Sequence, residues 1–246
     1  MKKAILFFLL MLPTFAFAAG PSVPLMKANV DVNDKASLQS GAKTFVNYCM
    51  GCHSLEFVRY QRLATDLEIP EDIVKATLIN GDKKIGDTMT IPMQKKESAV
   101  WFGVAPPDLT LTARSRGADW LYTYLMTFYV DNSRVVGVNN LVFKDVGMPH
   151  ILWELQGWQT PVYKTVTDSD GKTHQVIERL QADPNVSEAQ QAEYRRTVRD
   201  LVNFMAYAAE PARLQRESLG WKVMLFLALF FVVAYALKKE YWRDVH

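Results

Sequence analysis

Cysteine and net charge are both scarce in this sequence. Only two cysteines occur among 246 residues, and the formal charge is +2. A nearly neutral chain does not favour nucleic acid as a partner. The length and the 49% hydrophobic content exclude a disordered chain or a mini-protein, and we find no internal repeat and no low-complexity tract. These properties favour one sizeable globular domain with appendages.

The N-terminus has the pattern of a secretory signal. Two lysines precede the apolar run from Ala4 to Leu12, and small residues follow up to Ala18. The alternative is a first transmembrane helix, but the apolar run is short for a bilayer and ends at Pro13. We therefore expect residues 1–18 to be a signal peptide, with the mature chain beginning near Ala19.

A second apolar run lies near the C-terminus. Residues 219–237 are apolar on every face except at Lys222, and about 19 residues at 1.5 Å each cross most of a hydrocarbon core. A buried core helix, the alternative, has an apolar stripe on one face only. Basic residues follow the run at once. This asymmetry predicts an anchor helix at 219–237, a cytoplasmic tail at 238–246, and a domain at 19–218 on the outer side of a bacterial inner membrane, in the periplasm.

Periodicity and turn residues predict a mainly helical domain with one β-hairpin. The expected elements are helices at 36–48, from Pro70 to Asn80, at 119–130 and from Ser187 to Glu210, a long loop at 82–108, and a hairpin at 162–176. In the helix at 119–130, Trp120, Tyr124, Leu125 and Phe128 form an aromatic stripe. Such a stripe is more often core than the wall of a cofactor site.

The most informative pattern is the pentapeptide from Cys49 to His53. Its two thiols, three residues apart on a helical turn, face the same side, and His53 follows directly. This spacing suits two thioether bonds to one haem, with His53 on the iron. A thioredoxin-like redox pair needs a βαβ unit that the pattern lacks. A zinc site needs two more ligands, and only His150, His174 and His246 remain among the histidines.

A haem iron has a sixth position, for which the sequence offers several ligands. A methionine there raises the reduction potential. Met148 lies between Gly147 and Pro149, in a stiff and closely approachable loop, and Met93 follows Pro92. His150 would give a bis-histidine centre of lower potential. Spacing alone leaves these three alternatives open.

Several separated motifs resemble the cytochrome c1 family, the haem subunits of quinol:cytochrome c reductase, which is the cytochrome bc1 complex. The resemblance runs over nearly all of the mature chain. It is carried by Cys49 to Leu55, Arg59-Tyr60 and Arg62, Ala105 to Leu109, Arg114 to Arg116, Asp119-Trp120, Gly147 to Pro149, and Ala208 to Pro211.

The resemblance implies a class I cytochrome c-like domain with long loops around one covalently attached haem c. It implies that Cys49 and Cys52 attach the haem and that His53 and Met148 ligate its iron. Pro106 and Pro107 become pocket wall, and Arg116 lies near a propionate. The chain departs from the family at Trp120, where members often carry tyrosine, and it has no third cysteine for an extra disulfide.

The implied function is electron transfer without acid or base chemistry of the chain's own. The subunit would take an electron from the Rieske iron-sulfur subunit and pass it to a soluble cytochrome c. It would lie beside cytochrome b in a dimeric complex of the respiratory chain. Two alternatives remain, a freestanding anchored cytochrome and a haem sensor with an open sixth position.

Overall fold

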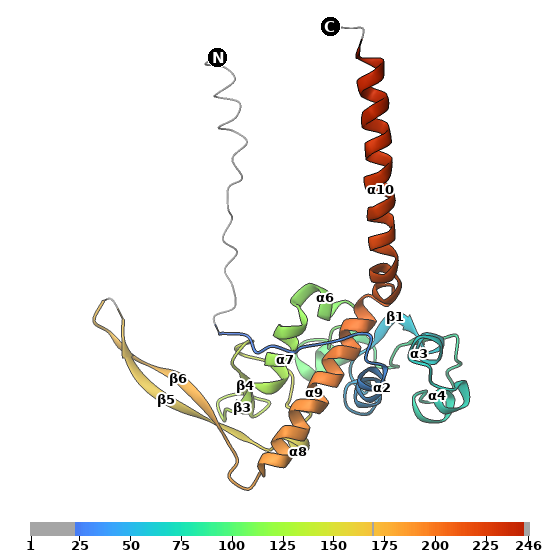
Figure 1. Cartoon of the computed structure of the whole chain (residues 1–246). Coiled ribbons are helices and arrows are strands. Elements are labelled where there is room, and N and C mark those ends of the chain that lie inside the picture. Colours follow the sequence, from blue (N-terminus) through green and yellow to red (C-terminus); the bar gives the residue numbers. More distant parts are fainter. Residues whose placement is uncertain (1–22, 169, 244–246) are drawn as a thin grey trace.

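A computed structural model describes residues 23–168 and 170–243 (Figure 1). The fold is mainly α-helical, as predicted, and it has three small sheets where the sequence predicts one hairpin. The helices are α2 (Lys35–Thr44), η1 (Phe45–Cys49), α3 (Tyr60–Leu67), α4 (Glu71–Thr77), α5 (Lys95–Phe102), α6 (Thr112–Arg116), α7 (Ala118–Met126), α8 (Trp153–Gln156), α9 (Glu188–Ala209) and α10 (Arg213–Tyr241). The strands are β1 (Leu55–Arg59), β2 (Thr88–Met89), β3 (Phe128–Val130), β4 (Val138–Asn140), β5 (Gln159–Thr167) and β6 (Thr173–Ala182).

The crossing of α2 over α9 forms the centre of the core. Gly41 is buried there, and a Cβ added to it would lie 2.0 Å from the backbone oxygen of Asp200. The side chains continue the contact: Ser37 Oγ donates to Asp200 Oδ1 at 2.7 Å, and the rings of Phe45 and Phe204 lie 5.8 Å apart. Because α2 leads directly into η1 and the cysteine motif, this crossing fixes where the motif begins.

Helix α9 confirms the last predicted helix of the domain. The Ser187 side chain caps its first turn, where Oγ accepts a hydrogen bond from Gln190 N at 3.2 Å. The helix ends at Ala209, before Glu210 and Pro211. Its predicted apolar face is buried throughout, at Tyr194, Val198, Leu201, Val202 and Met205.

Removing the cap of α9 is expected to destabilise the domain modestly. Ser187→Ala leaves the Gln190 amide without its acceptor and should cost about 1 kcal/mol. The check is the denaturant midpoint of the detergent-solubilised protein. Ser40→Ala is the matched control, because Ser40 is exposed in the interior of α2, where alanine is the better helix former. Equal midpoints for the two variants would contradict the cap.

Each of the three sheets is a two-stranded antiparallel pair. The hairpin of β5 and β6 confirms the one predicted at 162–176 but is longer, pairing Gln159 with Ala182 at its base. Its turn is held by Asp168, whose Oδ1 accepts from Lys172 N at 2.9 Å. Figure 1 shows the hairpin projecting away from the helices as a long arm.

Two expected elements differ from the structure. The predicted loop at 82–108 contains β2 and α5, because Thr88 and Met89 pair with β1 and because Gly103, at φ 78°, ends a helix that begins after Gln94. The predicted helix at 119–130 ends at Met126. The next residues, Phe128 to Val130, favour a strand by composition and pair with β4.

Helix α10 stands apart from the domain and is fully exposed along its apolar length (Figure 1). The segment Gln215–Tyr241 is the one helix in the described part of the chain that is long and apolar enough to cross a membrane, and it contains the predicted span at 219–237. The predicted signal peptide at 1–18 lies outside the described residues, as does the end of the predicted tail.

Candidate functional site

The cysteine motif follows a π-helical turn. In η1 the Met50 amide donates to Phe45 O at 2.9 Å, an i to i+5 bond that widens the helix by one residue. The chain then closes into a tight turn in which Cys49 O accepts from Cys52 N at 3.1 Å and from His53 N at 2.9 Å. This turn keeps Cys49, Cys52 and His53 together as one unit.

His53 is buried and held by one hydrogen bond. Its Nδ1 lies 2.7 Å from Pro107 O, and because a carbonyl only accepts, Nδ1 carries the proton. The Nε2 lone pair is therefore free to bind a metal. Burial lowers the pKa of His53, against smaller opposing effects of the Pro107 hydrogen bond and of Asp108. The ring is thus kept in the neutral form that ligates metals.

The two cysteines are half-buried free thiols. Burial, and to a smaller extent the neighbouring Cys52, raises the pKa of Cys49 to about 12. A redox-active pair instead needs a lowered thiol pKa, so the thioredoxin-like alternative receives no support. In the described residues no three His, Cys, Asp or Glu side chains lie close enough to hold a metal ion.

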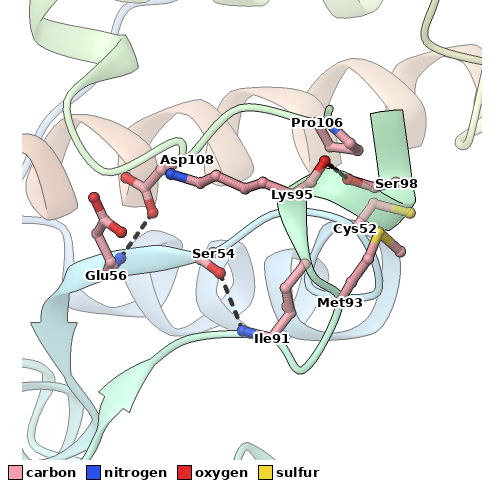
Figure 2. Close-up of a pocket in the computed structure, with 9 residues that line it drawn as sticks. All are labelled: Cys52, Ser54, Glu56, Ile91, Met93, Lys95, Ser98, Pro106 and Asp108. Carbon is pink, nitrogen blue, oxygen red and sulfur yellow. Dashed lines mark hydrogen bonds between the residues drawn. The ribbon is translucent and has the colours of Figure 1, made fainter. Parts of the chain in front are cut away.

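A pocket opens beside the second cysteine (Figure 2). Two hydrogen bonds to Ser54 join the segments around it: Leu109 N donates to the backbone oxygen of Ser54 at 2.9 Å, and Ile91 N donates to its side-chain Oγ at 3.0 Å. The segment after α5 is thereby tied to the residues that follow the motif. The lining residues are Cys52, Ser54, Glu56, Ile91, Met93, Lys95, Ser98, Pro106 and Asp108.

Met148 lies on a loop that approaches the same segment after α5. A Cβ added to Gly147 would lie 3.5 Å from Cγ1 of Val104, three residues before the Pro107 carbonyl that holds His53. The Met148 side chain packs against the small cluster of Phe128, Val138 and Val146. The loop thus carries a thioether close to the segment that positions the histidine.

An aromatic array leads from Arg116 to Met148. The Arg116 guanidinium lies 5.0 Å above the ring of Trp120, which stacks on Tyr124 at 5.2 Å and 8°. Tyr124 Oη then donates to Met148 Sδ at 3.3 Å. Burial raises the pKa of Tyr124, so this hydroxyl stays protonated as a donor. The stripe is core, as predicted: Leu125 and Phe128 are buried, and Trp120 and Tyr124 pack against the main core, with the Tyr124 hydroxyl directed at Met148.

The other candidate ligands lie in different surroundings. Met93 lines the pocket beside Cys52 (Figure 2). His150 is buried with its ring stacked on Phe128 at 4.9 Å, and burial lowers its pKa to about 4, against the opposing effect of Gln156. Within the described part of the chain, its buried Nε2 has no hydrogen-bond partner.

The structure thus gathers most of the predicted site residues around one segment, 104–108. His53 bonds to it, Pro106 and Pro107 belong to it, and Gly147 approaches it. Two thiols on one turn, a neutral imidazole with a free Nε2 and a thioether form a donor set that fits a haem. Sequence reasoning missed Tyr124. The available signal was a hydroxyl within an otherwise apolar stripe.

Comparison with known proteins assigns the chain to a family. The cytochrome C1 family matches residues 26–245. Cytochrome c1 of Allochromatium vinosum is 49% identical, and the alignment covers 100% of both chains. The ammonia monooxygenase gamma subunit of Nitrosomonas europaea is 47% identical over 100% of this chain and 99% of that protein. Cytochrome c1 of Rhodospirillum rubrum is 28% identical over 86% and 83% of the two chains.

Proposed function

The chain belongs to the cytochrome c1 family, and from this premise we propose that it carries electrons from a Rieske iron-sulfur subunit to a soluble cytochrome c. Family membership makes it a haem-binding electron-transfer subunit of the cytochrome bc1 complex, with cytochrome b and the Rieske subunit as partners. The donor, the acceptor and the direction of transfer are the proposed part. The haem supplies the one-electron redox couple.

The hydrogen bond between His53 and Pro107 carries the proposal. It fixes the tautomer of the ring and leaves Nε2 as the fifth ligand, next to two thiols placed for thioether bonds. We assign covalent attachment of one haem c to Cys49 and Cys52. The His53 ring is neutral and buried, so it is unsuited to act as an exposed acid or base.

Met148 is the proposed sixth ligand. Its loop approaches the Val104 segment, and its sulfur already accepts a hydrogen bond from a side chain on α7. The rival Met93 lines the pocket beside Cys52, on the segment before α5. His150 is stacked within aromatic rings. Histidine and thioether ligation together favour a high potential.

Pro106, Pro107 and Arg116 are the proposed wall of the haem pocket. The proline rings carry no N–H, so they can press on a porphyrin without leaving a donor unpaired. The Arg116 guanidinium is exposed above Trp120, where it is available to a propionate as a charge-assisted partner. Trp120, which replaces the tyrosine common in the family, supports Arg116 through its ring face rather than through a hydroxyl.

The proposed topology has the soluble domain, residues 19–218, in the periplasm of a bacterium. Residues 1–18 act as the signal peptide, α10 crosses the inner membrane once, and the tail at 238–246 is cytoplasmic. The basic residues at the end of α10, Lys238 and Lys239, support this orientation. The assembled complex is proposed to be dimeric, with the haem facing the periplasm.

The test is purification of the tagged full chain from membranes in a mild detergent. We expect it to bring down a cytochrome b and a Rieske protein, and the preparation should reduce a soluble cytochrome c when given quinol. The haem should stay on the polypeptide in a denaturing gel, as a covalent bond requires.

Other outcomes would overturn particular parts of the proposal. A chain that is fully functional alone would be a freestanding cytochrome. Copurification with monooxygenase subunits would favour the role named for the Nitrosomonas relative. Binding of carbon monoxide by the reduced protein would indicate an open sixth position and a sensor instead.

A further inference from the structure

The hydroxyl of Tyr124 reaches the sulfur of Met148. Tyr124 lies on α7, Met148 lies on the loop before α8, and Oη donates to Sδ over 3.3 Å. A thioether sulfur is a weak acceptor with two lone pairs, so it can bind a metal with one and accept this hydrogen bond with the other. The contact is therefore compatible with ligation by Met148.

The ring of Tyr124 is held on several sides. Trp120 stacks on it at 5.2 Å, and Phe128 meets it nearly edge-on at 5.0 Å and 70°. The backbone is fixed as well, because Asn140 Nδ2 donates to Tyr124 O at 2.7 Å. The hydroxyl cannot leave the sulfur without breaking these contacts, so its position is pre-organised.

We propose that Tyr124 is a positioning residue, which orients the Met148 thioether and raises the midpoint potential of the haem. This inference rests on the proposed ligation by Met148. The hydrogen bond draws electron density from the sulfur and makes it a poorer donor to the iron. A poorer donor destabilises the ferric state more than the ferrous state, and the midpoint potential therefore rises. The alternative is that Tyr124 only fills space, and in that case the ring alone suffices.

The substitution Tyr124→Phe separates these two roles, because phenylalanine keeps the ring stack and removes only the hydroxyl. We expect the ferric form to gain about fivefold over the ferrous form, as the loss of one hydrogen bond predicts. At 59 mV for each tenfold change, the midpoint potential should fall by about 40 mV. The measurement is a potentiometric titration of the holoprotein followed by its absorption spectrum.

Tyr122→Phe is the matched control, since Tyr122 is buried on the same helix, whereas the hydrogen bond to Met148 among the described residues comes from Tyr124. We expect this variant to keep the wild-type potential. Equal potentials for the two variants would overturn the role of Tyr124. A shift of the same size in both would assign the effect to general packing of α7.

The near-infrared charge-transfer band of the ferric protein distinguishes a failure of this inference from a failure of the proposed function. If the wild type has this thioether-to-iron band and Tyr124→Phe leaves the potential unchanged, only the role of Tyr124 fails. If the wild type lacks the band, Met148 is not the ligand and the proposed site is wrong. Retention of the band at altered energy in Tyr124→Phe supports both.

Discussion

Replacing Met148 with leucine is expected to lower the midpoint potential of the haem by about 0.3 V, within the roughly 0.8 V that axial ligands control. Leucine has a similar volume, so the contacts with Phe128 and Val146 should be retained while the thioether is lost. Electron transfer to a soluble cytochrome c should then cease. The measurement is a redox titration of the purified complex, together with its quinol-dependent turnover.

Met93→Leu is the matched control for this change. It removes a thioether from the pocket beside Cys52, and the potential should stay at the wild-type value. If instead Met93→Leu lowers the potential and Met148→Leu does not, the two assignments must be exchanged. An unchanged potential in both variants would leave His150 as the candidate.

Gly41→Ala is expected to destabilise the domain by about 3 kcal/mol, although alanine normally stabilises a helix relative to glycine. The added methyl group would lie 2.0 Å from Asp200 O and 2.7 Å from Phe204 Cβ, so α2 must move away from α9. For a domain of this size the melting temperature should fall by about 10 °C. Thermal unfolding of the haem-containing protein, followed by circular dichroism, measures the change.

The control for the close crossing is Gly86→Ala. No atom lies within 4 Å of a Cβ added at Gly86, so the melting temperature should hardly change. A stabilised Gly41→Ala variant would mean that the two helices are farther apart than in this structure. A loss of haem without loss of stability would place the effect at the motif instead.

The sequence predicts what depends on local chemistry. The start of the last helix at Ser187, its end at Glu210 and the hairpin at 162–176 are local features, and all three are found where expected. The close spacing of Cys49, Cys52 and His53 in the sequence is likewise local, because one turn brings the three residues together. Long-range pairing is not visible in the same way. The strand from Phe128 forms because Val138 to Asn140 lie beside it and pair with it. Helical periodicity in the sequence does not show this pairing, so the predicted helix at 119–130 runs through the strand.

Helix α5 shows a second reason for a wrong prediction. Its apolar residues Val100, Trp101 and Phe102 are consecutive and exposed rather than spaced along one face, so they give no helical period. At the site, the bond from His53 to Pro107 joins residues 54 positions apart, and no pattern in the sequence specifies it. Family resemblance supplied Pro107 as a pocket residue, but not its carbonyl as the partner of the histidine.

The π-turn η1 changes the direction, around the helix axis, in which the cysteine motif faces relative to α2. Helix α2 must present Gly41 to α9, while the turn that follows must aim His53 at Pro107. One residue of an α-helix advances the side chains by about 100° around the axis. The additional residue accommodated in the i to i+5 turn offsets the cysteines by about this angle relative to α2. The two ends of a single continuous helix can therefore face different partners, without a loop between the core and the haem-binding residues.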